Sequence, residues 1–169
     1  MPPISDLEAL TRMVVAMAIG AALGLERARA EKPAGMRTYM LVAQGAALFM
    51  ICALMLTSQL RANGIVSDPG RIASTVVQGV GFLAGGVILT TGRHVRGMTT
   101  AAGIWVAAAL GLMVGAGFLV VATTAALTTV AALVVLHQIE VRWLPWGQKS
   151  SLSETDADGP EDRLGGGSR

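Results

Sequence analysis

Hydrophobic residues fill long stretches of this chain without interruption by charge. Between Arg96 and Glu140 lie 43 residues that include no Lys, Arg, Asp or Glu, about twice the ~20 residues that one membrane-spanning helix needs. A charge at the centre of a bilayer costs roughly 2.5–3.5 kcal/mol on insertion scales, so long charge-free runs are typical of segments that lie in lipid. The pattern predicts an integral membrane protein of the all-α class, built as a bundle of several helices.

The apolar runs divide into five predicted spans of unequal length. Gly115 and Gly117 mark the break between the last two spans, because glycine commonly interrupts helices. In the first span only residues 13–25 are free of charge, and a helix of this length rises about 20 Å, less than the ~30 Å of a hydrocarbon core. Arg12 and Glu26 must therefore reach the interface or face a polar interior. The predicted spans are residues 7–25, 38–60, 72–91, 99–114 and 118–137.

The loops between the spans differ in positive charge, and this difference predicts the orientation of the chain. The loops after the first and third spans carry six Lys and Arg residues, whereas the loop after the second carries two. Because cytoplasmic loops are enriched in Lys and Arg, we predict the N-terminus outside and the C-terminus in the cytoplasm. The six inner cations are Arg27, Arg29, Lys32, Arg37, Arg93 and Arg96, and the two outer ones are Arg61 and Arg71.

The composition fits a membrane domain followed by a polar tail. The 169 residues are 53% hydrophobic and 14% charged, with a mean hydropathy of +0.59, whereas soluble domains are about 25% charged. We assign residues 1–146 to the transmembrane domain, with Trp143 and Trp146 in an inner interfacial belt. Residues 147–169 are rich in Ser, Gly, Asp and Glu and predict a disordered cytoplasmic tail, whose last five residues resemble an appended linker. The single cysteine, Cys52, is expected to be a buried packing residue.

Polar residues at the predicted cytoplasmic face form the first candidate site. Glu26 lies at the inner edge of the first span, where an unpaired charge is costly, so we expect it to pair with a cation such as Arg27, Arg37 or Arg96. The pair could lock the loop to the bundle, or Glu26 could serve as a ligand or proton site.

The same face offers a candidate anion site. The helices that begin near Thr38 and near Thr99 and Thr100 would direct their unpaired N–H groups and positive dipole ends toward the inner cations. Such an arrangement favours an anion such as phosphate or a lipid headgroup. The alternative is that these cations only orient the protein in the membrane.

Three further residues complete the candidate set. On the predicted outer side, Asp68 followed by Pro69 and, two residues later, Arg71 suits the start of a helix, although Asp68 could also capture a cation. Trp105 is an amphipathic side chain within a span. Side chains of this kind form hydrogen bonds between helices or contact a substrate.

The sequence contains no nucleophile–base set, no phosphate-binding glycine loop and no Cys/His cluster. We therefore expect no enzyme, no cofactor and no metal site. Three pairs of glycines spaced four residues apart would let helix backbones approach closely, either within one subunit or across a homodimer, and we predict a homodimer. The pairs are Gly20/Gly24, Gly81/Gly85 and Gly111/Gly115.

Five segments, taken in order, resemble the MgtC/SapB family of bacterial inner-membrane proteins. The likeness covers about residues 5–140, and the ordered set is more specific than any one segment. The segments are Gly24-Leu25-Glu26-Arg27, Lys32-Pro33-Ala34-Gly35-Met36-Arg37-Thr38, Asp68-Pro69-Gly70-Arg71-Ile72-Ala73, Gly81-Phe82-Leu83-Ala84-Gly85-Gly86-Val87-Ile88 and Val95-Arg96-Gly97-Met98-Thr99-Thr100-Ala101-Ala102-Gly103-Ile104-Trp105.

This resemblance implies a multi-pass protein of the bacterial inner membrane. Members of the family are associated with adaptation to low magnesium, with acid tolerance and with survival of pathogens inside macrophages. The resemblance further implies a regulator with a membrane-protein partner such as the F-type ATP synthase. Many members add a folded cytoplasmic domain after the membrane part. The alternative is a magnesium or other ion transporter formed by a homo-oligomer. Magnesium is normally held by carboxylates, and the predicted inner face is strongly cationic, so we favour the regulator.

Overall fold

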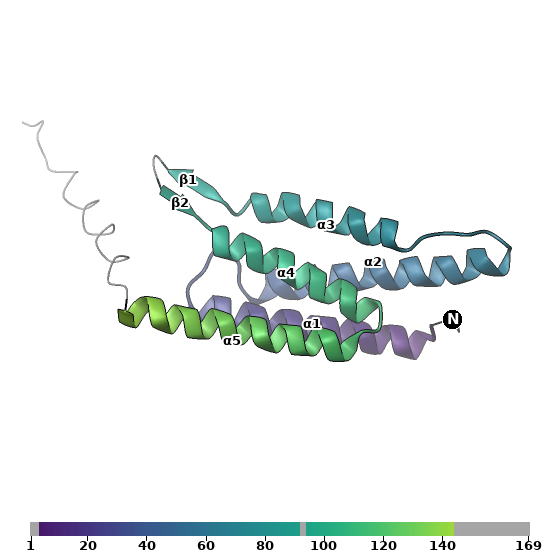
Figure 1. Ribbon diagram of the computed structural model, residues 1–169, viewed down its shortest axis with the longest axis horizontal. Helices are drawn as coiled ribbons and strands as arrows, with labels where there is room; N and C mark the ends of the chain where they lie inside the picture. Colours follow the sequence, from purple (N-terminus) through teal and green to yellow (C-terminus); the bar gives the residue numbers. More distant parts are fainter. Residues whose placement is uncertain (1–3, 92–93, 144–169) are drawn as a thin grey trace, which may run out of the picture. The chain divides into compact units, whose positions relative to one another are not determined.

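The computed structural model describes residues 4–91 and 94–143, and these form five helices and one short hairpin (Figure 1). The all-α helix bundle is confirmed. Four of the helices are long and apolar enough to cross a membrane, namely α1, α2, α4 and the part of α5 that ends at Ile139. The elements are α1 (Asp6–Arg29), α2 (Met36–Ala62), α3 (Gly70–Gly85), β1 (Leu89–Thr91), β2 (His94–Arg96), α4 (Met98–Gly115) and α5 (Leu119–Trp143).

The predicted third span is too long by several residues. The helix α3 ends at Gly85, and its 16 residues rise about 24 Å, less than the ~30 Å hydrocarbon core. The strands β1 and β2 follow and pair antiparallel, with Leu89 opposite Arg96. An apolar run without a clear period does not distinguish a helix from a strand. The glycines Gly85 and Gly86 end the helix, and the β-branched threonines that follow favour the strand.

The contacts divide the chain after Ala132, and the packing described here is that of the unit that ends there. Successive helices of this unit run in opposite directions (Figure 1). One end of the bundle, called the basic end below, therefore holds residues 30–35 and the β1–β2 hairpin. The opposite end holds the start of α1, residues 63–69 and residues 116–118. This alternation agrees with the predicted course of the chain, and which end faces the cytoplasm stays a prediction.

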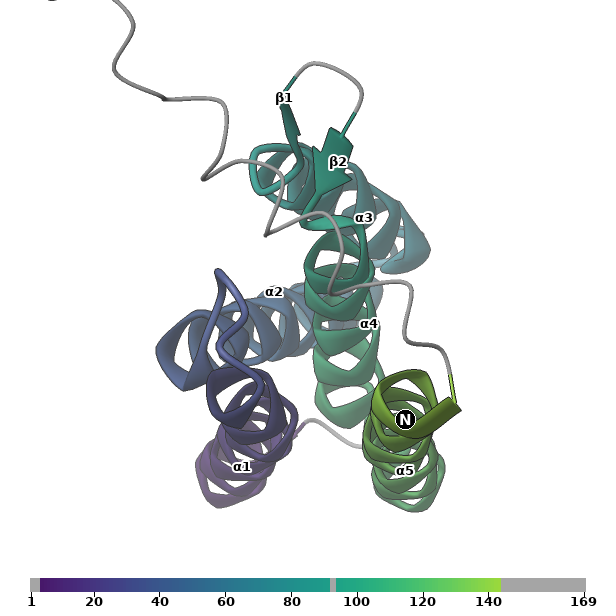
Figure 2. The ribbon, with the colours of Figure 1, turned by 90° about the vertical axis from the view of Figure 1, so that its left-hand side faces the viewer.

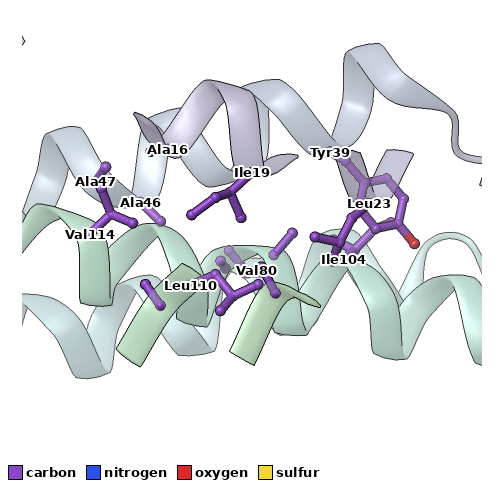
Figure 3. Close-up of a cluster of buried hydrophobic side chains, with 14 of the residues drawn as sticks. Ala16, Ile19, Leu23, Tyr39, Ala46, Ala47, Val80, Ile104, Leu110 and Val114 are labelled. Carbon is purple, nitrogen blue, oxygen red and sulfur yellow. The ribbon is translucent and has the colours of Figure 1, made fainter. Parts of the chain in front are cut away.

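The helices α1, α2 and α4 form the core of the unit, and α3 lies on the side of α4 away from α1 (Figure 2). The core is built largely from alanine and other small or medium side chains (Figure 3), which let helices approach closely in a membrane. Its labelled members include Ala16, Ile19 and Leu23 of α1, Tyr39, Ala46 and Ala47 of α2, and Ile104, Leu110 and Val114 of α4.

Two of the three glycine pairs lie at contacts inside this core. A Cβ atom added to Gly20 would lie 2.5 Å from the Tyr39 carbonyl oxygen, and one added to Gly24 would lie 2.5 Å from the Met36 Cα. The pair on α4 meets α2 in the same manner, because a Cβ on Gly111 would lie 2.2 Å from the Ala43 carbonyl oxygen. The backbones of α1 and α4 thus both pack directly against α2.

The third glycine pair is different. Cβ atoms added to Gly81 and Gly85 would meet no atom within 4 Å, so this face of α3 packs against no other part of the described chain.

Cys52 on α2 is exposed, and the expectation that it is buried is wrong: it points away from the core, where an apolar thiol side chain can face lipid.

Candidate functional site at the basic end of the bundle

Glu26 and Arg27, at the end of α1, form an ion pair. The Arg27 guanidinium donates from Nη2 to Glu26 Oε1 at 2.8 Å and from Nε to Glu26 Oε2. The side chains of Arg27 and Glu26 are 3% and 11% exposed. A two-pronged arginine–carboxylate pair of this kind fixes the geometry of both groups. The expectation that Glu26 pairs with a nearby cation is confirmed, and the partner is the adjacent arginine.

The hydroxyl of Tyr39 lies within electrostatic reach of this pair. Tyr39 is fully buried, and its hydroxyl donates a hydrogen bond to the Thr100 carbonyl oxygen at 3.2 Å. Gly103 permits this contact, since a Cβ there would lie 2.2 Å from the hydroxyl oxygen. The phenol therefore joins the first turn of α2 to the first turn of α4.

The first turns of α2 and α4 both begin with glycine. Neither Gly35 nor Gly97 can supply a side-chain cap. Gly97 has φ +88°, and a Cβ at this position would lie 2.2 Å from the Val87 carbonyl oxygen, so no other residue fits without strain. The tight turn from the hairpin into α4 thus depends on this glycine.

The other residues predicted at this end do not join the buried cluster. Arg37, Thr38, Arg96 and Thr99 are all exposed, and among the described residues their side chains make no hydrogen bond or ion pair. Arg37 therefore does not share the carboxylate of Glu26. The cluster at the basic end consists of the buried residues Arg27, Tyr39 and Thr100 and the half-buried Glu26, and we call it the basic-end cluster.

The remaining predicted residues lie elsewhere. The Asp68 carboxylate accepts the backbone N–H of Gly70 at 2.8 Å, but α3 begins at Gly70 with Pro69 as its N-cap, so the expectation that Asp68 is the N-cap is wrong by one residue. Arg71 is exposed beside it at the opposite end. Trp105 is 49% exposed on the outer surface of α4. The ten predicted residues therefore do not form one site.

Sequence reasoning missed the importance of Tyr39, although it is the only tyrosine in the chain. It also left open where the Arg12 side chain lies. Arg12 is 12% exposed, donates to the Gly115 carbonyl oxygen at 2.7 Å and forms an ion pair with Glu8. It thus satisfies a terminal carbonyl of α4 at the opposite end of the bundle, where a cation is favoured by the helix dipole.

Two other features bear on what can enter the bundle. An apolar groove of about 610 Å³ lies between α2 and α3, with Thr75 as the one hydroxyl residue among its lining. Within the part of the chain that the structure describes, no three His, Cys, Asp or Glu side chains group in a way that could hold a metal ion.

This architecture defines a multi-pass helix-bundle membrane protein whose interior is closed by small residues. The sequence model of the MgtC family matches residues 13–142, and the chain belongs to that family. No solved structure matches the chain.

Several relatives share this membrane region. The chain is 39% identical over 136 residues to the Escherichia coli K12 protein named "Putative magnesium transporter YhiD", an alignment that covers 80% of this chain and 63% of that protein. It is 42% identical over 104 residues to Protein MgtC of Salmonella typhimurium, covering 62% of this chain and 42% of that one. An uncharacterized Synechocystis protein, slr0014, is 45% identical over 106 residues, or 63% and 42% of the two chains. The chain thus spans less than two thirds of the length of these relatives.

Proposed function

We propose that this protein acts in adaptation to low magnesium, as a regulator of another machine in the bacterial inner membrane rather than as an autonomous transporter. The link to magnesium is supported by family membership and by the name of the relative YhiD. The preference for a regulator rests on the chemistry of the basic-end cluster and on the closed core.

The observation that carries this preference is the pairing of Glu26. Two nitrogens of the buried Arg27 guanidinium already donate hydrogen bonds to the two oxygens of its carboxylate. Magnesium gives up its waters reluctantly and is held by one or two carboxylates that are free to bind it. A carboxylate neutralised by a fixed guanidinium offers such an ion neither net charge nor an open geometry, so Glu26 is a structural group.

The packing of the core points the same way. Along α2, the backbone carbonyls of Tyr39 and Ala43 lie where a Cβ on Gly20 or Gly111 would clash. Helices in backbone contact leave no space between them for a hydrated cation. The groove between α2 and α3 is open, but its apolar lining does not replace the hydration shell of an ion.

The alternative is a transporter formed by a homo-oligomer, and the name of YhiD favours it. In that arrangement the open glycine face of α3, at Gly81 and Gly85, would meet a second copy and complete a pathway. The two hypotheses differ in a property that can be measured in cells, the initial rate of magnesium entry.

We would compare cells that carry or lack the chain at limiting magnesium. A regulator predicts poor growth of the deletion strain with an unchanged initial rate of magnesium entry, reported by an intracellular magnesium dye. A fall in that rate in proportion to the growth defect would support the transporter. The deletion strain is also complemented with the Glu26→Gln variant. Its matched control is Glu31→Gln, which removes an exposed acid from the loop beside the basic-end cluster.

A further inference from the structure

A second polar site lies at the opposite end of the bundle, away from the basic-end cluster. A pocket of about 330 Å³ opens there between α1, the last turns of α2 and the turn that follows α4. Its lining combines apolar residues with charged and hydroxyl-bearing ones. The lining residues are Ile4, Glu8, Arg12, Leu54, Thr57, Ser58, Arg61, Pro69 and Ala116.

Two arginines from different helices face this pocket. Arg12 is held in place by the Gly115 carbonyl oxygen at 2.7 Å and by Glu8. Arg61 in the last turn of α2 is exposed and makes no ion pair within the described part of the chain. With Glu8 as the one acid of the lining, the pocket has a net charge of +1. Because Glu8 already compensates Arg12, the uncompensated positive charge of the lining is that of Arg61, and it favours an anion in the pocket.

The lining also includes the Thr57 hydroxyl. The Thr57 Oγ1 atom accepts a hydrogen bond from the Ser67 hydroxyl at 3.0 Å. A hydroxyl has one proton to donate, and in the described residues Thr57 donates it to no protein acceptor. Ser58 is different, because it gives its proton to the Met55 carbonyl oxygen at 2.7 Å. Thr57 can therefore donate to an oxyanion that the arginines attract.

We propose that this pocket binds a phosphate group. Guanidinium forks match the oxygens of phosphate two at a time, and Arg61 and Thr57 supply donors that no other described residue of the chain accepts. The apolar lining residues Leu54 and Pro69 suit a glycerol or acyl segment attached to the phosphate. The same chemistry could come from a phospholipid headgroup or from free inorganic phosphate. This site is independent of whether the protein regulates or transports.

A divalent cation does not suit the pocket. Glu8 is its one carboxylate, and Arg12 already engages it. Glu8 instead opposes the anion, since its negative charge lines the same pocket. This opposition gives a test in which one substitution weakens binding and another strengthens it.

The experiment measures binding to the full-length protein in a neutral detergent by calorimetry. The probes are dioctanoyl phosphatidylglycerol, inorganic phosphate and dioctanoylglycerol, which has the same acyl chains and no phosphate. Arg61→Gln removes an exposed cation and leaves the packed side chains in place. It should weaken binding of the phosphate-bearing probe by about tenfold or more, the loss expected for a hydrogen bond to a charged group.

Glu8→Gln keeps an oxygen that can accept from Arg12 and removes the opposing charge, so it should tighten binding. Arg71→Gln is the matched control, because it removes another exposed cation near the same end that does not line the pocket. Its affinity should equal that of the unsubstituted chain. Binding of phosphatidylglycerol without binding of inorganic phosphate identifies a lipid headgroup, and the reverse identifies the free ion.

Three results would overturn the proposal. The first is that neither phosphate-bearing probe binds. The second is that dioctanoylglycerol binds as well as phosphatidylglycerol, which would assign affinity to the acyl chains alone. The third is that Arg61→Gln and Arg71→Gln change the affinity equally, which would indicate general attraction to surface charge.

Discussion

Replacing Gly111 with alanine should destabilise the protein, whereas the same change at Gly81 should not. At Gly111 the new Cβ would lie 2.2 Å from the Ala43 carbonyl oxygen and 2.9 Å from its carbon. These are backbone atoms of a neighbouring helix, so relief requires α4 to move away from α2. Overpacking of this kind costs roughly 1–3 kcal/mol, and the displaced core contacts add to that cost.

The change at Gly81 provides the matched control. Its Cβ would meet no atom within 4 Å, and alanine is favoured over glycine inside a helix by about 1 kcal/mol. Gly81→Ala should therefore leave the stability unchanged or raise it. Because both glycines lie inside helices, this gain is common to the two variants, and their difference should be roughly 1–3 kcal/mol, the cost of overpacking at Gly111.

Equilibrium unfolding in mixed detergent, followed by circular dichroism, measures this difference. The packing of α4 on α2 predicts a lower unfolding midpoint for Gly111→Ala than for Gly81→Ala. Equal midpoints would refute the direct backbone contact of α2 with α4. A large loss at Gly81 alone would indicate that the open face of α3 is covered in the assembled protein.

Three further predictions concern the ion pair, the orientation and the assembly. Arg27→Gln should lower the free energy of unfolding by about 3–5 kcal/mol, because it leaves the Glu26 carboxylate without its ion-pair partner, while Arg37→Gln should change it little. In a double-mutant cycle, Glu26 should couple to Arg27 and not to Arg37. Reporter fusions should place Asn63 outside and Gln148 in the cytoplasm, and an alkaline-phosphatase signal from the second would reverse the topology. Mass measurement in nanodiscs should give twice the 17.4 kDa of one chain, and a monomer at every concentration would exclude the homodimer.

Hydropathy predicted the helices well because lipid burial constrains whole segments. The starts of α2 and α4 came within two residues of the expected positions, since the cationic loops before them cannot enter the bilayer. The end of the third span was wrong because Leu89, Thr90 and Thr91 satisfy a hydropathy pattern as well in a strand as in a helix. The tail assigned to residues 147–169 and the belt at Trp146 lie outside the described residues.

The candidate site was predicted less completely, because its contacts join residues distant in the sequence. The sequence offers three cations to Glu26, and only the fold shows that Arg27 is oriented back onto it. The bond from Tyr39 to Thr100 spans 61 positions, and no local pattern indicates it. The glycine pairs showed where backbones could approach, but whether a pair faces its own chain or open space depends on how the helices are rotated.

Magnesium flux through the purified protein tests the central claim most directly. The full chain would be reconstituted in liposomes that contain a magnesium-sensitive dye, with and without the Glu26→Gln substitution. A regulator whose Glu26 is engaged by Arg27 predicts no uptake above that of empty liposomes in either case. Robust uptake by the unsubstituted chain that disappears in Glu26→Gln would contradict the account and identify this carboxylate as part of a transport pathway.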